Sequence, residues 1–282
     1  MFGAVVGDIV GSRFRFNNRR TKEFELFTPG CFVTDDSIMT LAVAKAIMQT
    51  EKLIGATEHD ETFSDKYCVT LDQMTVRYMR EIGRKYPECG YGGMFSRWIF
   101  SKEPKPYNSY GNGAAMRVSP AGFAARTESK AIQLADIITR VTHDHEEGIK
   151  GGSAVALAIF LARCGATMDE IRNRMTDYYD LDFRIDDIRD SYRFDETCQG
   201  TVPQAIKAFL ESASFEDAIR IAVSVGGDSD TIAAITGSIA EAHYGIPDSI
   251  RDAALPYLDN ELWGIYADWN IFISKSGLDK LV

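Results

Sequence analysis

Residues 230–244 read DTIAAITGSIAEAHY, and between Asp230 and Glu241 this run carries no charge. Its apolar residues recur with the period of an α-helix, about 3.6 residues. A helix with so few charges is buried on most of its sides, and small residues such as Ala, Gly and Ser let neighbouring helices pack closely against it. A second run of this kind covers 151–164. Together the two runs predict the buried central layer of an all-α protein.

Helical periodicity extends outward from these two runs over most of the chain. Further helices are predicted at 37–49, 71–86, 131–141, 203–211, 215–225 and 248–257. No segment alternates convincingly as a β-strand does, so the predicted fold is a compact all-α bundle. Three stretches lack the helical period, namely 13–33, 89–119 and 177–201, and long connections of this sort are usually functional or mobile. The last is rich in aromatic residues, and we favour a packed loop over a substrate rim for it.

Length, composition and charge restrict the class of protein. With 282 residues and 45% hydrophobic residues, the chain is expected to form one domain over 1–282. A net charge of −10 argues against nucleic acid or an anionic membrane as a partner. There is no signal peptide pattern and no membrane-spanning run, and the five cysteines fit neither a disulfide framework nor a zinc site. We therefore expect a soluble cytoplasmic monomer.

Two acidic motifs stand where apolar helices are predicted to begin. They are Thr34-Asp35-Asp36-Ser37 and Asp228-Ser229-Asp230-Thr231. Capping of the helix is one explanation, since Asp, Ser and Thr are preferred at helix N-termini. However, several carboxylates at the start of a buried helix are costly unless a cation neutralises them, and carboxylate and hydroxyl oxygens suit Mg²⁺. We predict that the motifs meet around two magnesium-like ions, in a site that lacks the glycine and glutamate of an EF-hand.

Between these motifs, residues 108–117 read NSYGNGAAMR. Glycines with small neighbours allow backbone N–H groups to surround phosphate oxygens, although Asn-Gly is also a common turn. His143 follows in the sequence, close to His145. A structural histidine is the alternative, but we regard His143 as a candidate substrate contact.

In this order the motifs resemble those of the ADP-ribosylglycohydrolase family, which includes the dinitrogenase-reductase-activating glycohydrolases and the vertebrate ADP-ribosyl-acceptor hydrolases. The matching segments, spread over nearly the whole chain, are GAVVGDIVGS at 3–12, TDDS at 34–37, YGNGAAMR at 110–117, Thr142-His143, and SVGGDSDTIA at 224–233. The resemblance implies an orthogonal all-α bundle with two Mg²⁺ or Mn²⁺ ions. It also implies cleavage of the N- or O-glycosidic bond between ADP-ribose and a protein side chain or small acceptor.

Functional residues are carried over position by position. The implied metal ligands are Thr34, Asp35, Asp36, Asp228, Asp230 and Thr231. The implied contacts to ADP-ribose are Ser109, Tyr110, Gly111, Asn112, Gly113 and His143.

The chain departs from the family pattern at the position of a reactive acid. Several relatives have a glutamate shortly after the first glycine motif, where this chain has Arg15. Others use an aspartate in the loop that corresponds to 90–93, which holds no acid here. Arg15 cannot act as a base, so its side chain is expected to turn away or to meet a phosphate or carboxylate.

Acids that could take over the catalytic role are Asp35, Asp36, Asp228, Glu23 and Glu25. Three alternatives to a hydrolase of this family stay open: a catalytically silent ADP-ribose-binding protein, a structural protein without a ligand, and a metal-dependent phosphatase.

Overall fold

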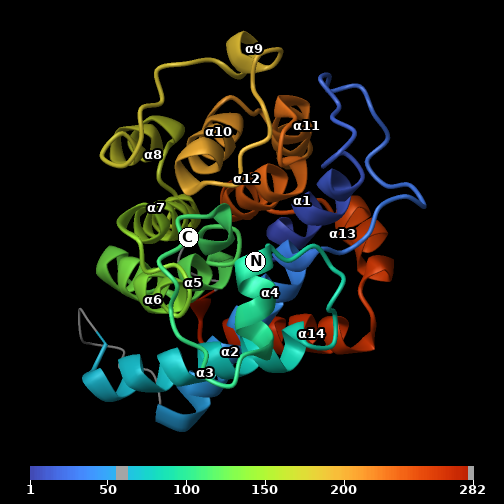
Figure 1. Ribbon diagram of the computed structural model, residues 1–282. Helices are drawn as coiled ribbons and strands as arrows, with labels where there is room; N and C mark the ends of the chain where they lie inside the picture. Colours follow the sequence, from blue (N-terminus) through green and yellow to red (C-terminus); the bar gives the residue numbers. More distant parts are fainter. Residues whose placement is uncertain (55–62, 279–282) are drawn as a thin grey trace.

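The computed structural model describes residues 1–54 and 63–278, and throughout this range the regular elements are helices (Figure 1). The all-α prediction is confirmed, because these residues form no β-strand and only an isolated bridge between Gly111 and Thr197. The predicted domain 1–282 also includes 55–62 and 279–282, which lie outside the described residues. None of the described helices is long and apolar enough to cross a membrane.

The helices, in chain order, are α1 (Phe2–Ser12), α2 (Asp35–Ile54), α3 (Asp65–Gly83), α4 (Gly93–Phe100), η1 (Asn112–Ala114), α5 (Ser119–Ala124), α6 (Glu128–Arg140), α7 (Glu146–Arg163), α8 (Met168–Met175), α9 (Ile185–Ile188), α10 (Cys198–Leu210), α11 (Phe215–Val225), α12 (Ser229–Tyr244), α13 (Asp248–Ala254), η2 (Leu255–Tyr257) and α14 (Asn260–Lys275). The elements η1 and η2 are short 3₁₀ helices.

The predicted central layer is present. Every residue of α12 from Ser229 to Ala240 is buried, and so is most of α7. Helix α12 packs against α1, α7, α10 and α11, so it lies inside the bundle (Figure 1). Low charge and small side chains therefore mark the helices at the centre of the fold.

Helices α1 and α12 pack with their backbones in contact. A Cβ atom placed on Gly7 would lie 2.0 Å from the carbonyl oxygen of Ala233, and one on Gly237 would lie 2.2 Å from the carbonyl oxygen of Gly3. Real Cβ atoms essentially never come within 3.0 Å of another heavy atom in this way. Glycine at these positions is thus required for the two helices to approach, and the approach brings Asp8 of α1 close to the start of α12.

Several helix boundaries differ from those predicted. Helices α1, α5, α8 and α14 were not predicted. Helices α4 and α9 lie inside the stretches 89–119 and 177–201, which lacked a helical period in the sequence. The helix predicted at 203–211 begins at Cys198, because the Thr197 side chain accepts a hydrogen bond from the backbone N–H of Gly200 and caps an earlier turn. The prediction for 215–225 is confirmed without change.

The segment 13–33 has no helix, as predicted, and it is fixed to the start of α12. The Asn18 side chain donates to the carbonyl of Gly227 at 3.0 Å and accepts from the N–H of Gly227 at 2.9 Å. Arg20 donates to the carbonyls of Val225 and Tyr192. These bonds fix the path of the chain that immediately follows Arg15.

Candidate active site

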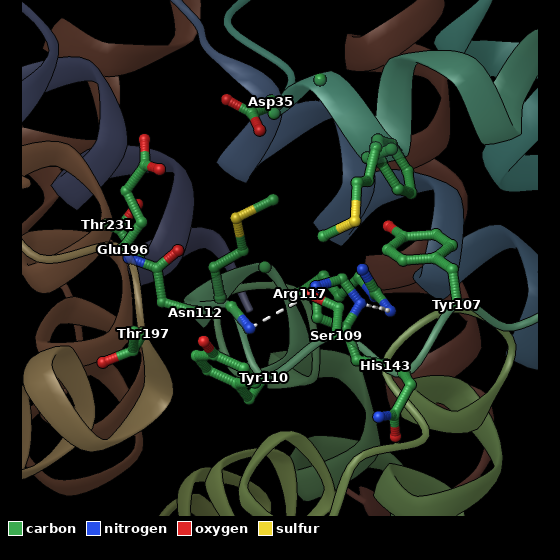
Figure 2. Close-up of a pocket in the computed structure, with 18 of the residues that line it drawn as sticks. Asp35, Tyr107, Ser109, Tyr110, Asn112, Arg117, His143, Glu196, Thr197 and Thr231 are labelled. Atoms are coloured by element: carbon green, nitrogen blue, oxygen red, sulfur yellow. Dashed lines mark hydrogen bonds between the residues drawn. The ribbon is translucent and has the colours of Figure 1, made fainter.

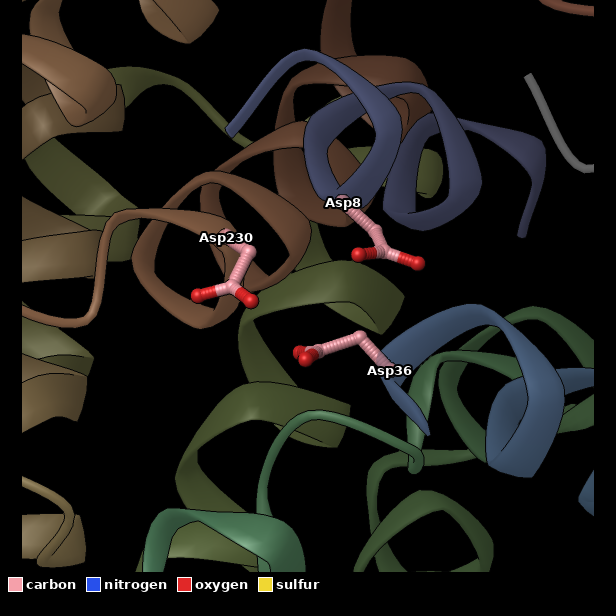
Figure 3. A group of neighbouring side chains, drawn as sticks. All are labelled: Asp8, Asp36 and Asp230. Carbon is pink, nitrogen blue, oxygen red and sulfur yellow. The ribbon is translucent and has the colours of Figure 1, made fainter. Parts of the chain in front are cut away.

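The structure brings the two acidic motifs together at the N-termini of α2 and α12. Thr231 Oγ1 donates to Asp36 Oδ2 at 3.2 Å. Asp8, Asp36 and Asp230, each from a different helix, point toward one another, and each offers an oxygen that lies within 4.8 Å of the others' (Figure 3). Residues separated by nearly 200 positions in the sequence thus form one acidic site.

Asp8 is a site residue that the sequence analysis missed. Its Oδ1 accepts from Thr34 Oγ1 at 2.6 Å, and its Oδ2 accepts from Thr34 N at 2.9 Å, Ser37 N at 3.1 Å and Ser37 Oγ at 2.5 Å. Three of these bonds go to Oδ2 and one to Oδ1, so Asp8 positions the Thr34–Ser37 motif while it still offers an oxygen to the group that it forms with Asp36 and Asp230. The available signal was a carboxylate inside the apolar run 3–12.

The other aspartates have oxygens that form no hydrogen bond within the described part of the chain. These atoms are Asp35 Oδ1, Asp36 Oδ1, Asp228 Oδ1 and Asp230 Oδ2. Burial, and then neighbouring carboxylates, raise the pKa of Asp36 and of Asp230 well above the ordinary range. Buried oxygens of this kind fit a hard divalent cation, and the motif residues that could offer oxygen ligands are Thr34, Asp35, Asp36, Asp228, Asp230 and Thr231.

Arg15 is the cation that the structure already places there. Its Nε lies 3.2 Å from Asp228 Oδ1, and its Nη1 lies 3.5 Å from Asp230 Oδ2 and 3.7 Å from Asp35 Oδ1. Burial opposes the charge of Arg15, but the three aspartates outweigh it and raise the pKa of the guanidinium. Of the two expectations for Arg15, the one that it meets carboxylates is confirmed.

Glu23 and Glu25 do not reach this site. Both side chains are exposed, and neither lines the cavity beside the acidic residues. Phe24, between them, packs inward against Phe14, with ring centroids 5.1 Å apart. The two exposed glutamates thus flank an inward-packed phenylalanine and point away from the acidic residues. The structure therefore gives no support to their suggested catalytic role.

The loop at 90–93 contacts the site through its backbone, without an acid. Gly90 has a φ of +114°, which side chains other than glycine rarely adopt. A Cβ on Gly90 would lie 2.9 Å from Arg15 Nη1 and 3.0 Å from Asp35 Oδ1. The absence of a side chain here leaves room for the ion pair between those two residues.

A cavity of about 500 Å³ opens onto the acidic site (Figure 2). Its lining includes all of the predicted substrate contacts, which are Ser109, Tyr110, Gly111, Asn112, Gly113 and His143. Arg15, Asp35 and Thr231 line its acidic end. Glu196 and Thr197 also border it, so the stretch 177–201, predicted as a packed loop, forms part of the rim at its C-terminal end.

Asn112 joins the glycine-rich segment to the acidic site. Its Nδ2 donates to Asp228 Oδ2 at 2.7 Å and to Thr201 Oγ1 at 3.0 Å, while its backbone N–H donates to the carbonyl of Glu196 at 2.7 Å. The side chain is buried. The wall of the cavity and one acidic residue are thus held as a single unit.

His143 is oriented by a buried arginine that the sequence analysis did not single out. Arg117 Nη2 donates to Thr142 Oγ1 at 2.6 Å, and Thr142 Oγ1 lies 2.7 Å from His143 Nδ1. Arg117 Nη2 also lies 3.4 Å from His143 Nδ1, and because a guanidinium only donates, Nδ1 is the acceptor, which assigns the proton of the imidazole to Nε2. Burial, and then Arg117, lower the pKa of His143 well below its ordinary value. A neutral imidazole therefore offers its Nε2–H to the cavity.

Comparisons with known proteins agree with this arrangement. ADP-ribosylhydrolase ARH3 of Xenopus tropicalis is 25% identical to this chain, in an alignment that covers 94% of this chain and 92% of the relative. Human ADP-ribosylhydrolase ARH3 is 24% identical, in an alignment that covers 92% of this chain and 89% of the relative. ADP-ribosylarginine hydrolase Tri1 of Pseudomonas putida is 25% identical, covering 87% of this chain and 70% of its own. A solved structure of an ADP-ribosylglycohydrolase-related protein complex has a TM-score of 0.60 at 22% identity, covering 91% of this chain and 94% of its own, which confirms the predicted fold type.

The sequence profile described as ADP-ribosylglycohydrolase matches residues 1–270. Because this match spans nearly the whole chain, the protein belongs to the ADP-ribosylglycohydrolase family.

Proposed function

We propose that this protein is a metal-dependent hydrolase that cleaves the glycosidic bond between ADP-ribose and a modified protein side chain or small acceptor. The observation that carries the proposal is a cavity whose glycine-rich wall ends at the acidic site. Relatives named ADP-ribosylhydrolase and ADP-ribosylarginine hydrolase support the same reaction class.

The glycine-rich wall suits the diphosphate of ADP-ribose. A Cβ on Gly113 would lie 3.3 Å from His143 Nε2, and one on Gly111 would lie 3.5 Å from the same atom. Glycine at both positions therefore leaves the Nε2–H open to an anionic oxygen. Arg97 and Arg117 also line the cavity and add positive charge that attracts a diphosphate.

In this proposal the ribose lies at the acidic end of the cavity. Thr34, Asp36, Asp230 and Thr231 would hold a divalent ion, Mg²⁺ or Mn²⁺, which supplies a Lewis acid for ribose hydroxyls and lowers the pKa of a bound water. Asp35 is the aspartate of the two motifs that lines the cavity. In this proposal Asp35 would orient the attacking water and accept its proton, while charge develops at the anomeric carbon.

A panel of substrates tests the proposal directly. Purified protein with Mg²⁺ or Mn²⁺ is incubated with arginine-linked, serine-linked and acetyl-linked ADP-ribose, and free ADP-ribose is measured by chromatography. We expect release from at least one substrate, and loss of release with EDTA or in Asp35→Asn.

The matched control is Asp252→Asn, the same chemical change at an exposed aspartate of α13, which should leave the rate unchanged. No release from any substrate, together with tight binding of ADP-ribose in calorimetry, would replace the proposal with a silent ADP-ribose-binding protein.

A further inference from the structure

We infer that the Arg15 guanidinium takes the place of one of the two cations, so that this chain binds a single divalent ion where its ligand set predicts a pair. The inference rests on the proposed function in so far as that function requires a metal site. It concerns the number of ions and the residue that sets this number.

The acidic site divides into two halves that share Asp230. In the outer half, Asp228 Oδ1, Asp230 Oδ2 and Asp35 Oδ1 all face the Arg15 guanidinium, at 3.2, 3.5 and 3.7 Å. An Mg²⁺ ion bound by the same oxygens would have to lie about 2.0–2.1 Å from each of them. That position lies against the guanidinium nitrogens, so steric overlap and repulsion between like charges exclude the two cations from the outer half at the same time.

The inner half keeps the composition of an ion site. Asp36 is 1% exposed, and its Oδ1 has no hydrogen bond in the described part of the chain. Two hydroxyls lie beside its other oxygen, Thr34 Oγ1 at 3.3 Å and Thr231 Oγ1 at 3.2 Å. Arg15 makes no ion pair with Asp36 among the described residues, so this carboxylate still lacks a cation.

Arg15 is held in the site by its surroundings. The Asn18 side chain donates to the carbonyls of Phe14 and Arg15, at 2.8 and 3.2 Å, and is itself fixed to Gly227 at the start of α12. The backbone at Gly90 lies against the guanidinium, since a Cβ there would be 2.9 Å from Arg15 Nη1. Only 15% of the Arg15 side chain is exposed, so it belongs to the interior of the site. Rotation of this side chain toward solvent would leave three buried carboxylates without their counter-charge.

Metal stoichiometry tests the inference without reference to turnover. Bound Mn²⁺ per chain is measured by calorimetry and by elemental analysis of dialysed protein, for the wild type, Arg15→Glu and Arg15→Gln. We expect one ion in the wild type and a twofold increase in both variants, because each frees the outer oxygens. Electron paramagnetic resonance should show isolated Mn²⁺ in the wild type and a spin-coupled pair in Arg15→Glu.

The matched control is Arg13→Glu, which makes the same charge change two residues earlier. Arg13 donates to Thr28 Oγ1 and to the carbonyl of Glu25, away from the aspartates, so its variant should keep one ion. Two ions in the wild type, none in the wild type, or an unchanged count in both Arg15 variants would each overturn the inference. Should Arg15→Glu fail to fold, the wild-type count and Arg15→Gln still decide the question.

The result is separable from the proposed function. A wild type that binds one ion but releases no ADP-ribose keeps the inference and removes the hydrolase. A wild type that releases ADP-ribose with a spin-coupled pair bound keeps the hydrolase and removes the inference.

Discussion

Replacing Gly7 by alanine tests the contact between α1 and α12 on which the acidic site is built. The new Cβ would lie 2.0 Å from the oxygen, and 2.3 Å from the carbon, of the Ala233 carbonyl. Both are backbone atoms and cannot rotate aside, so the helices must separate by about 1 Å to reach the shortest Cβ contacts that real structures show.

The expected cost follows from two opposing effects. Alanine favours a helix over glycine by about 1 kcal/mol, whereas overpacking a tight interior costs about 1–3 kcal/mol, and more where backbone must move. Because α1 is buried along its whole length, we expect the second effect to exceed the first, with a net loss of about 2 kcal/mol in the free energy of unfolding. Mn²⁺ affinity should fall as well, since separation of α1 from α12 displaces Asp8.

The matched control is Gly264→Ala within α14, where a new Cβ would meet nothing within 4 Å. Only the higher helix propensity of alanine then changes the free energy of unfolding, which should rise by about 0.5–1 kcal/mol. Both variants and the wild type are unfolded in urea and followed by circular dichroism, with midpoints compared at equal m-values. A Gly7→Ala midpoint at or above that of the wild type would refute the close-packing argument.

Three further outcomes are expected. Burial lowers the pKa of His143 in the folded protein, whereas the unfolded chain gains a proton there below about pH 6.5. The free energy of unfolding should therefore fall as the pH falls, by up to about 1.4 kcal/mol per pH unit from this group, and urea titrations from about pH 7.5 to about pH 5.5 should show a shallower loss in His143→Gln. Asp8→Asn removes acceptors from the Thr34–Ser37 motif and should weaken Mn²⁺ binding about 10- to 100-fold by calorimetry, and unchanged affinity would exclude its positioning role. Gly90→Ala should lower stability in thermal melting by about 1–3 kcal/mol, because of its positive φ and its contact with Arg15, whereas Gly92→Ala, with open space around it, should be nearly neutral.

The sequence was sufficient to predict the central helices, since an uncharged run with helical period has few other ways to be buried. It was insufficient for α1, whose glycines are poor helix formers in isolation and are explained only by the partner helix they touch. Asp8 was missed for the same reason, because its role depends on Thr34 and Ser37 lying beside α1 in space.

The parts of the candidate site that depend on residue type could be predicted from the sequence. The parts that depend on the path of a loop could not. Carboxylates and hydroxyls at two helix starts predicted a shared acidic site, which hydrogen-bonded residues of both motifs form, and the glycine-rich segment, predicted to surround phosphate oxygens, lines the cavity beside it. Whether Arg15 turned inward depended on the tether between Asn18 and Gly227. The outward direction of Glu23 and Glu25 depended on Phe24 packing inward, which composition alone does not reveal.

Under the proposed function, the hydrogen bond from Asn112 to Asp228 would couple the binding of an ion to the binding of ADP-ribose. Ordering Asp228 for the acidic site also orders the wall that receives the ligand, so part of the conformational entropy lost in the first event is not lost again in the second. Such a coupling is reciprocal: the factor by which an ion raises the affinity for ADP-ribose equals the factor by which ADP-ribose raises the affinity for the ion. Scarcity of either one in the cell would therefore lower the occupancy of both.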